Sequence, residues 1–227
     1  MKTKINGRLL ALALSRYVMA VLCVGAMLFL PAGTLKYWNG WLYMGVLFGS
    51  MIFVLAYLIL NDPGLLEKRM NMKEREKPQK WYLALSLIVF FLVFTIPGLD
   101  YRFHWSDVPL SVVLIATGLV LAGYFMFFMV MKQNSYASRV VEIQEEQKLI
   151  ETGLYSVVRH PMYLAATILF LFSPLVLGSY YAGIPALFIP FLLAYRLKNE
   201  EKVLLGGLKG YDEYVKRVKY RLIPYIW

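Results

Sequence analysis

The chain has 227 residues, of which 59% are hydrophobic, and it carries a formal net charge of +10 at pH 7. Soluble domains are usually about 45–50% apolar, and here the excess falls in blocks long enough to cross a bilayer, which excludes an ordinary soluble enzyme. The single Cys23 excludes a disulfide framework and a thiolate metal cluster. With only two histidines, a zinc or haem site built by the protein is not expected.

Six apolar blocks are predicted as membrane-spanning helices, at about 10–31, 41–60, 81–98, 109–131, 162–178 and 180–195. None carries Asp, Glu or Lys in its middle, as the cost of burying charge in lipid requires. The first block is too long for the apolar core of a signal peptide, so we expect an uncleaved span. The last two are short, and prolines interrupt them, which predicts kinked or tilted helices; these are Pro174, Pro185 and Pro190. The predicted fold is an all-α membrane protein with about six transmembrane helices.

Basic residues gather in the segments that would share one side of such a membrane. All of the 24 Lys and Arg except Lys36 and Arg102 lie at Arg16 or in the segments 1–9, 61–80, 132–161 and 196–227. This positive-inside pattern predicts a multi-pass protein with both termini in the cytoplasm. Membrane topology then explains the net charge, so we expect membrane lipids and no nucleic acid as partners.

Residues 61–80 form a charged connection between the second and third predicted spans. Pro63 at a first turn, followed by GLLEKRMNMKEREK, predicts a helix whose apolar members Leu65, Leu66, Met70 and Met72 could lie against lipid headgroups. A charged connector that also sets topology is the simpler interpretation. We divide the chain into 1–131, a four-span membrane region with the cytoplasmic loop 61–80, and 132–227, a catalytic region with two further spans and a cytoplasmic C-terminal segment.

Outside its two short spans, the last third of the chain is polar, aromatic and basic. The run VVEIQEEQKLI at 140–150 predicts a short amphipathic segment, part strand and part helix. Pro161 suits the first turn of the fifth span, which places His160 at or beside the helix N-cap, where free N–H groups favour an anion. Arg196 and Glu200 are four apart and would share one helix face. Each feature alone has an ordinary structural interpretation, as an interfacial anchor or a solvated salt bridge.

Together, the order and spacing of these features resemble the isoprenylcysteine carboxyl methyltransferases and, more distantly, the phospholipid N-methyltransferases. TG-x-Y-x-x-x-RHPMY is followed, after about thirty apolar residues, by R-x-x-x-EE, Y-x-x-Y and a closing RLIP. The resemblance covers about residues 132–225. The family's common G-P-Y is here Gly153-Leu154-Tyr155, so the turn is less rigid although the tyrosine is retained.

This resemblance implies S-adenosylmethionine as cofactor, held between the ends of the last membrane helices and the cytoplasmic C-terminal segment. The absence of G-x-G-x-x-G from the sequence fits that arrangement. The matching positions imply cofactor-binding roles for Gln147, Lys148, Leu149, Ile150, Tyr155, His160, Pro161, Met162, Tyr163 and Glu200. They also imply that Arg196 holds a substrate carboxylate.

Methyl transfer from a sulfonium is an in-line displacement that needs alignment and water exclusion rather than a metal. A carboxylate acceptor is already ionised at neutral pH, and the planar fork of Arg196 would orient it. An amine acceptor would need a base, for which Glu201 or a tyrosine is the candidate. The presence of Arg196 favours the carboxylate.

We therefore predict a methyltransferase of a bacterial or archaeal plasma membrane, acting on a lipophilic small molecule or lipidated acceptor that enters from the bilayer. The Met- and Phe-rich run 123–131 is a candidate lining of the entry. The alternatives are a phospholipid N-methyltransferase, an NADPH-dependent reductase on a related membrane fold, a scaffold or a transporter. The lack of charge within the predicted spans counts against an ion-coupled transporter.

Overall fold

A computed structural model describes residues 6–70 and 77–227, with the backbone only for 77–80. Within these ranges the chain is helical, with a 3₁₀ turn at Gly153–Ser156 and no β-strand, so the prediction of an all-α fold is confirmed. The helices are α1 (Gly7–Ala32), α2 (Trp38–Asn61), α3 (Pro63–Met70), α4 (Lys77–Phe103), α5 (Leu110–Gln133), α6 (Pro161–Val176), α7 (Gly183–Ala186), α8 (Ile189–Gly207) and α9 (Tyr211–Arg217).

Among the described helices, four are long and apolar enough to cross a membrane: α1, α2, the Trp81–Phe103 part of α4, and α5. They correspond to the first four predicted spans. Many of their large apolar side chains are exposed on the outside of the bundle, for example Leu22, Phe53 and Leu87. Exposed apolar surface of this extent suits contact with lipid chains, which indicates an integral multi-pass membrane protein.

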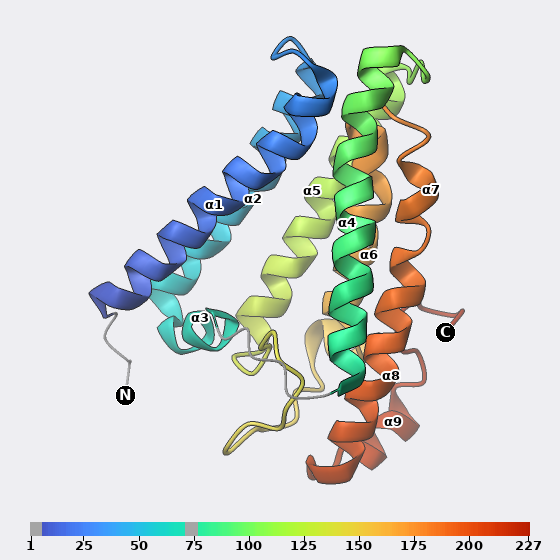
Figure 1. Cartoon of the computed structure of the whole chain (residues 1–227). Helices are drawn as coiled ribbons and strands as arrows, with labels where there is room; N and C mark the ends of the chain where they lie inside the picture. Colours follow the sequence, from blue (N-terminus) through green and yellow to red (C-terminus); the bar gives the residue numbers. More distant parts are fainter. Residues whose placement is uncertain (1–5, 71–76) are drawn as a thin grey trace.

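The last two predicted spans take a different form. The 16-residue α6 is apolar and includes Pro174. At 1.5 Å per residue it is about 24 Å long, shorter than a hydrocarbon core of about 30 Å. The block 180–195 is not one helix, because α7 and α8 are separate, with Pro185 inside α7 and Pro190 in the first turn of α8. The expected interruption is thus confirmed for the sixth block, whereas Pro174 lies within the continuous helix α6. Figure 1 shows α7 above α8 on the same side of the bundle.

The helices pack tightly at one end of the bundle and diverge at the other. Figure 1 shows the α1–α2 pair meeting α4 near the loop that joins α1 to α2 and leaning away from α4 and α6 toward the N-terminus. At the tightly packed end, a Cβ added to Gly98 of α4 would collide with the carbonyl oxygen of Leu28. Nearby, Asn39 Nδ2 donates a 2.9 Å hydrogen bond to the carbonyl of Val176. Close backbone contact and polar ties therefore fix α1 and α2 against α4 and α6.

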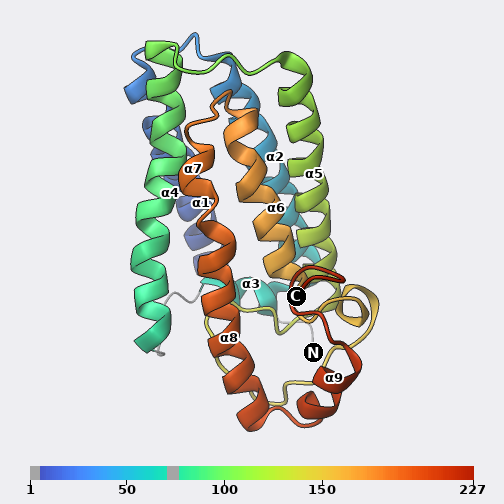
Figure 2. The same cartoon turned by 90° about the vertical axis from the view of Figure 1, so that its right-hand side faces the viewer.

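The start of α1, the C-terminus, α3 and α9 lie toward the divergent end (Figures 1 and 2). The helix predicted within 61–80 is confirmed for α3, and its predicted continuation through 71–76 lies outside the described residues. Leu65 and Leu66 do not lie on headgroups as expected; both are buried in an apolar cluster that includes Met131 of α5. The possible headgroup contact, raised beside the simpler interpretation of a charged connector, therefore does not hold for these two residues, because α3 packs against the ends of α1, α2 and α5.

The segment between α5 and the 3₁₀ turn contains turns and bends, so the strand and helix expected within 140–150 are absent from it. Side chains satisfy its backbone groups in place of a regular ladder. Gln144 Nε2 donates to the carbonyl of Tyr136 at 2.8 Å, and Arg69 Nη1 donates to the carbonyl of Ala137 at 2.8 Å. Arg69 comes from a distant part of the chain and Gln144 from eight residues along the same segment, so the periodicity of neighbouring residues did not reveal either partner.

The contact of Gly98 with α1 predicts a strong effect of one added methyl group. Gly98→Ala should lower the free energy of unfolding by about 1–3 kcal/mol, because the Cβ would collide with backbone that can move only with the whole helix. Gly118→Ala in α5 is the matched control, because no atom lies within 4 Å of its added Cβ. Unfolding of both variants in detergent micelles measures the difference; equal stability would contradict the close α1–α4 contact.

Candidate active site

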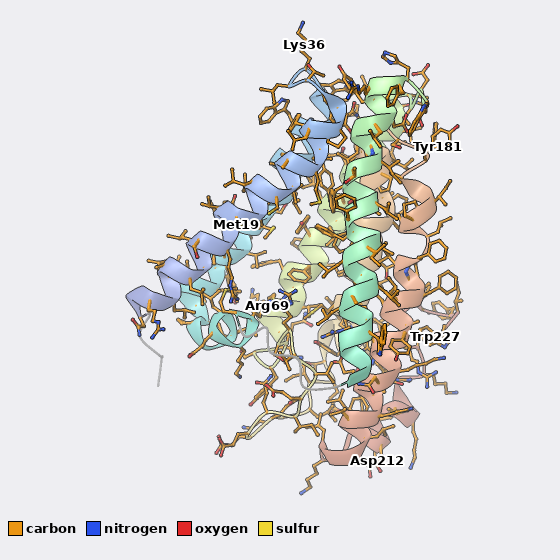
Figure 3. All side chains as sticks on the ribbon, in the orientation of Figure 1. Met19, Lys36, Arg69, Tyr181, Asp212 and Trp227 are labelled. Carbon is orange, nitrogen blue, oxygen red and sulfur yellow. The ribbon has the colours of Figure 1, made fainter. Side chains whose placement is uncertain are left out.

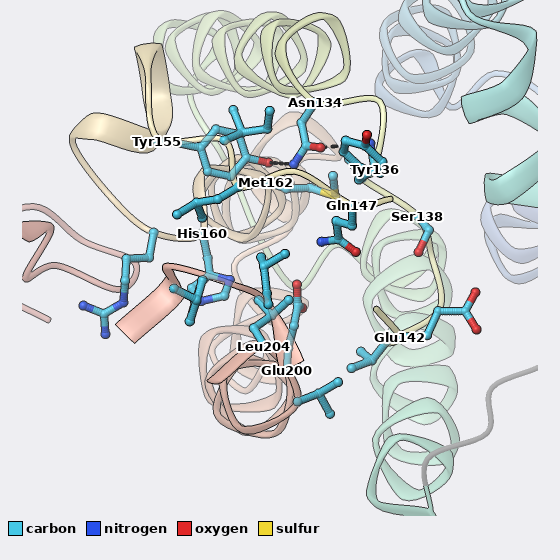
Figure 4. A pocket seen from close by; sticks show the side chains of 18 of the residues that line it. Asn134, Tyr136, Ser138, Glu142, Gln147, Tyr155, His160, Met162, Glu200 and Leu204 are labelled. Carbon is cyan, nitrogen blue, oxygen red and sulfur yellow. Dashed lines mark hydrogen bonds between the residues drawn. The ribbon is translucent and has the colours of Figure 1, made fainter. Parts of the chain in front are cut away.

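A partly open cavity of about 860 Å³ lies at the divergent end, between the segment that follows α5, the start of α6, and helices α8 and α9. All ten residues predicted to contact a cofactor line it, as does Arg196. Figure 4 shows Gln147, Tyr155, His160, Met162 and Glu200 around this one cavity. Segments more than forty residues apart in the sequence therefore share a site.

The start of α6 is positioned as the sequence predicted. Pro161 occupies the first helical turn and His160 is the N-cap, with no hydrogen bond from its own side chain to the helix. The backbone N–H of His160 donates to the carbonyl of Arg221 at 3.0 Å, which ties the N-terminus of α6 to the C-terminal segment. The His160 ring stacks on that of Tyr163, with 5.7 Å between ring centres. Because Pro161 and Met162 line the cavity, the positive end of the helix opens onto it.

Beside the cavity, the carboxylate of Glu201 is held by three groups. Its Oε1 accepts from Arg159 Nε at 2.6 Å and lies 3.3 Å from His160 Nε2, and its Oε2 accepts from Arg221 Nε at 2.8 Å. The side chains of Arg159 and Glu201 are only 3% and 7% exposed. Burial alone would raise the pKa of Glu201, but hydrogen bonds from His160, Arg159 and Arg221 more than offset it and lower the pKa to about 2.

Glu201 is thus an ionised anchor between α8, the start of α6 and the C-terminal segment. It is not among the residues that line the cavity. A carboxylate with so low a pKa is also a weak proton acceptor. The general-base role predicted for Glu201 therefore gains no support from its position.

Glu200, the preceding residue, faces the cavity instead. The hydroxyl of Tyr163 donates to Glu200 Oε2 and accepts from Arg196 Nε at 3.0 Å, so this tyrosine joins the two side chains that share a face of α8. Arg196 also donates to the carbonyl of Arg139, and its guanidinium lies 5.0 Å from the ring centre of Tyr82. In the described chain, Oε1 of Glu200 accepts no hydrogen bond, which leaves it available to a ligand.

Several residues of the site had no predicted role. Asn134 Nδ2 donates to the hydroxyl of Tyr155 at 2.8 Å, and the hydroxyl of Tyr214 donates to the carbonyl of Tyr155 at 2.7 Å. Tyr211 also lines the cavity, and its buried hydroxyl has no partner in the described chain. Burial and then the charges of the nearby carboxylates raise the pKa of Tyr211, so its hydroxyl stays a neutral donor. The Y-x-x-Y spacing was the available signal for Tyr211 and Tyr214, whereas nothing local marked Asn134.

The anchoring role of Glu201 predicts a pH-dependent loss of stability. Glu201→Gln should lower the free energy of unfolding by about 3 kcal/mol at neutral pH, because it leaves the buried guanidinium of Arg159 without its counter-charge; Arg221 is partly exposed and adds less. The pKa of about 2 lies below the ordinary value of about 4.3, so this stabilisation is complete above pH ~4.3 and is lost as the pH falls toward 2. Unfolding of wild type and variant in detergent from neutral to acid pH measures it.

Glu151→Gln is the matched control, because Glu151 pairs with Arg217 on the surface, where the two side chains are 40% and 60% exposed. Such pairs contribute about 1 kcal/mol or less. Equal losses in the two variants, or a difference that persists undiminished near pH 2, would contradict the anchor.

Comparison with known proteins finds similarity in the part of the chain that contributes to the cavity. Residues 114–206 match the isoprenylcysteine carboxyl methyltransferase (ICMT) family. The chain is also similar to the Delta(14)-sterol reductase TM7SF2 of Mus musculus, at 26% identity over 140 residues, which cover 55% of this chain and 33% of the reductase. The chain thus spans about a third of the length of that relative. Residues 114–206, which hold the α6 and α8 sides of the cavity, are thus similar to the isoprenylcysteine carboxyl methyltransferase family.

Proposed function

We propose that the chain is an integral membrane methyltransferase that uses S-adenosylmethionine and acts on a lipophilic acceptor, with a carboxylate as the favoured accepting group. The observation that carries the proposal is the shared cavity of His160 and Tyr163 on α6 with Glu200 on α8. These residues belong to the two motifs of the family resemblance, and the hydroxyl of Tyr163 bonds directly to Glu200.

The residues around the cavity suit the chemical groups of this donor. S-adenosylmethionine supplies an electrophilic methyl group on a sulfonium, with an ammonium and a carboxylate at one end. Glu200 would hold the ammonium or the ribose hydroxyls through its uncommitted oxygen, as a charge-assisted bond. The N-terminus of α6 at His160 would take the carboxylate. The rings of Tyr155 and Tyr163 would lie against the adenine or the cationic sulfur.

Arg196 would orient the acceptor. It lies on the same face of α8 as Glu200 and is held by Tyr163 and by the ring of Tyr82. A planar guanidinium can bind a carboxylate through two parallel hydrogen bonds, which aims one carboxylate oxygen at the methyl carbon. An ionised carboxylate needs no base. This fits a site whose adjacent carboxylate, Glu201, is committed to Arg159 and Arg221.

The acceptor would enter from the bilayer. A groove of about 600 Å³ between α2 and α5 is almost wholly apolar and is lined by Phe53, Tyr124, Phe125 and Phe128 among others. Three of these lie in the 123–131 run, which supports that run as part of a lipophilic path. Apolar grooves open to lipid suit the chain of a lipophilic acceptor.

For topology, we propose six crossings, with α6 and the α7–α8 pair as the last two and both termini in the cytoplasm of a bacterial or archaeal cell. The regions 1–131 and 132–227 would form one bundle, because α4 of the first packs against α8 of the second. Placing the cavity on the cytoplasmic side gives a soluble donor access to it.

The similarity to a sterol reductase supports a second candidate, a reductase that binds NADPH in the same cavity. A phospholipid N-methyltransferase is a third. It would require a base, and the position of Glu201 does not favour this. A scaffold without catalysis would not require a carboxylate facing the cavity, as Glu200 does, beside the buried, unpartnered hydroxyl of Tyr211 in the described chain.

Donor binding tests the leading proposal. Purified protein in detergent should bind S-adenosylmethionine, and Glu200→Gln should weaken binding at least tenfold, on the order of 1.4 kcal/mol, because it removes the charge that faces the donor's ammonium. Equilibrium dialysis with labelled donor measures both affinities. Glu213→Gln is the control, because Glu213 is an exposed carboxylate of α9 outside the cavity. Protein that binds NADPH and ignores S-adenosylmethionine would favour the reductase.

The role of Arg196 is tested by turnover. Arg196→Lys should keep donor affinity within about twofold of wild type but lower kcat on a carboxylate acceptor at least tenfold, because an ammonium cannot form the two parallel bonds of a guanidinium. Transfer of labelled methyl to an N-acetyl-S-prenylcysteine measures turnover. Unchanged kcat in this variant would remove the proposed orienting role.

A further inference from the structure

Four arginines from four separate segments gather on the side of the cavity that faces α1 and α3: Arg16 of α1, Arg69 of α3, Arg139 of the segment after α5, and Arg196 of α8. Their contacts form a connected series. Arg16 Nη1 donates to the carbonyl of Met70, the residue after Arg69. Arg69 Nη1 donates to the carbonyl of Ala137 at 2.8 Å, and Arg196 donates to the carbonyl of Arg139. Figure 3 shows Arg69 in the space where α1 and α2 diverge from the rest of the bundle.

In the described chain, backbone carbonyl oxygens accept hydrogen bonds from Arg16 and Arg69, and a carbonyl and the hydroxyl of Tyr163 accept from Arg196. Within residues 6–70 and 77–227, the ion pairs that form involve Glu151 and Glu201, and none involves Arg16, Arg69 or Arg139. The side chain of Arg139 makes no hydrogen bond to the described chain. Burial and then the charges of Arg196 and Arg16 lower the pKa of Arg139, and burial and then the charge of Arg139 lower that of Arg69 to about 10. An anion between the guanidiniums would relieve this repulsion.

The surface beside Arg16 is apolar. Leu12 and Met19 lie four residues before and three residues after Arg16, so they share its face of α1, and both are exposed. A membrane lipid has a charged headgroup and hydrocarbon chains. The arginine could bind the headgroup, and the exposed apolar face of the helix could contact the chains. Inorganic phosphate has no hydrocarbon part that could contact the apolar part of this surface.

We propose that Arg16, Arg69 and Arg139, with Arg196 at their edge, form a binding site for the phosphate group of a membrane lipid. Guanidiniums match the geometry of phosphate oxygens and bind them through paired hydrogen bonds. The lipid's chains would continue along the face of α1 that carries Leu12 and Met19. Arg16, Arg69 and Arg139 have no part in the proposed methyl transfer, and only Arg196 at their edge is shared with it.

Binding of a short-chain lipid to the full-length protein tests the site. Dihexanoyl phosphatidic acid should bind in a neutral detergent, whereas dihexanoylglycerol, which lacks the phosphate, should bind at least tenfold more weakly. Arg139→Gln and Arg16→Gln should each weaken binding of the phosphatidic acid about tenfold, as expected for the loss of one charge-assisted contact. Arg8→Gln is the matched control, because Arg8 is an exposed arginine nearer the N-terminus of the same helix. Isothermal titration calorimetry measures each affinity.

Arg139→Gln should fold normally, since the Arg139 side chain makes no hydrogen bond to the described chain. A thermal unfolding curve checks this. If Arg139→Gln does not fold, the affinity of Arg16→Gln tests the site. Unchanged affinity in both variants, or an equal loss in Arg8→Gln, would overturn the site in favour of general charge attraction. Inorganic phosphate that displaces the lipid at equal concentration would assign the arginines to a soluble phosphate and overturn the lipid assignment. Because no donor is present, failure here leaves the methyl-transfer proposal untouched.

Discussion

The carboxylate of Glu201 is the contact on which the arrangement of the cavity depends. Its two oxygens bind Arg159 and His160 at the start of α6 and Arg221 near the C-terminus. Arg159 in turn donates to the carbonyls of Val218 and Lys219, so one guanidinium fixes the course of the C-terminal segment. A buried ion pair of this kind is costly to break because the remaining charge cannot return to water. The start of α6, helix α8 and the C-terminal segment are therefore held in a single arrangement.

The adjacent carboxylates of α8 divide two tasks between them. Successive residues of an α-helix point about 100° apart, so the side chains of Glu200 and Glu201 leave the helix in different directions. Glu201 points toward the anchor and Glu200 toward the cavity, where it meets Tyr163. The two adjacent glutamates thus differ in position: Glu201 supports the site and Glu200 lines the cavity.

The divergence of α1 and α2 from the rest of the bundle separates the polar end from the packed end. At the packed end, Gly98 allows backbone contact between α4 and α1, and the hydroxyl of Tyr37 donates to the carbonyl of Leu177. At the other end, α3 fills part of the gap and brings Arg69 toward Arg139. The anionic side of the site, at Glu200, thus lies next to a strongly cationic one. A pocket that carries negative charge on one side and positive charge on the other can accommodate ligand groups of opposite charge.

The sequence by itself determined the helical class, the first four spans, the helix at Pro63 and the placement of His160 and Pro161 at the start of α6. These features depend on apolar length and on residues within one or two turns of a helix end, so they can be recognised locally. The conformation of 140–150 and the burial of Leu65 were mispredicted, because partners distant in sequence decide them.

The tertiary structure alone decided which glutamate faces the cavity, how Arg159 and Arg221 share Glu201, and that four arginines from separate segments come together. Arg159 and Glu201 are 42 residues apart, and Arg16 and Met70 are 54 apart. No local periodicity links such residues, because their proximity arises only when the helices pack. Motif order pointed to the residues of the site, whereas helix packing set their contacts and their charge environment.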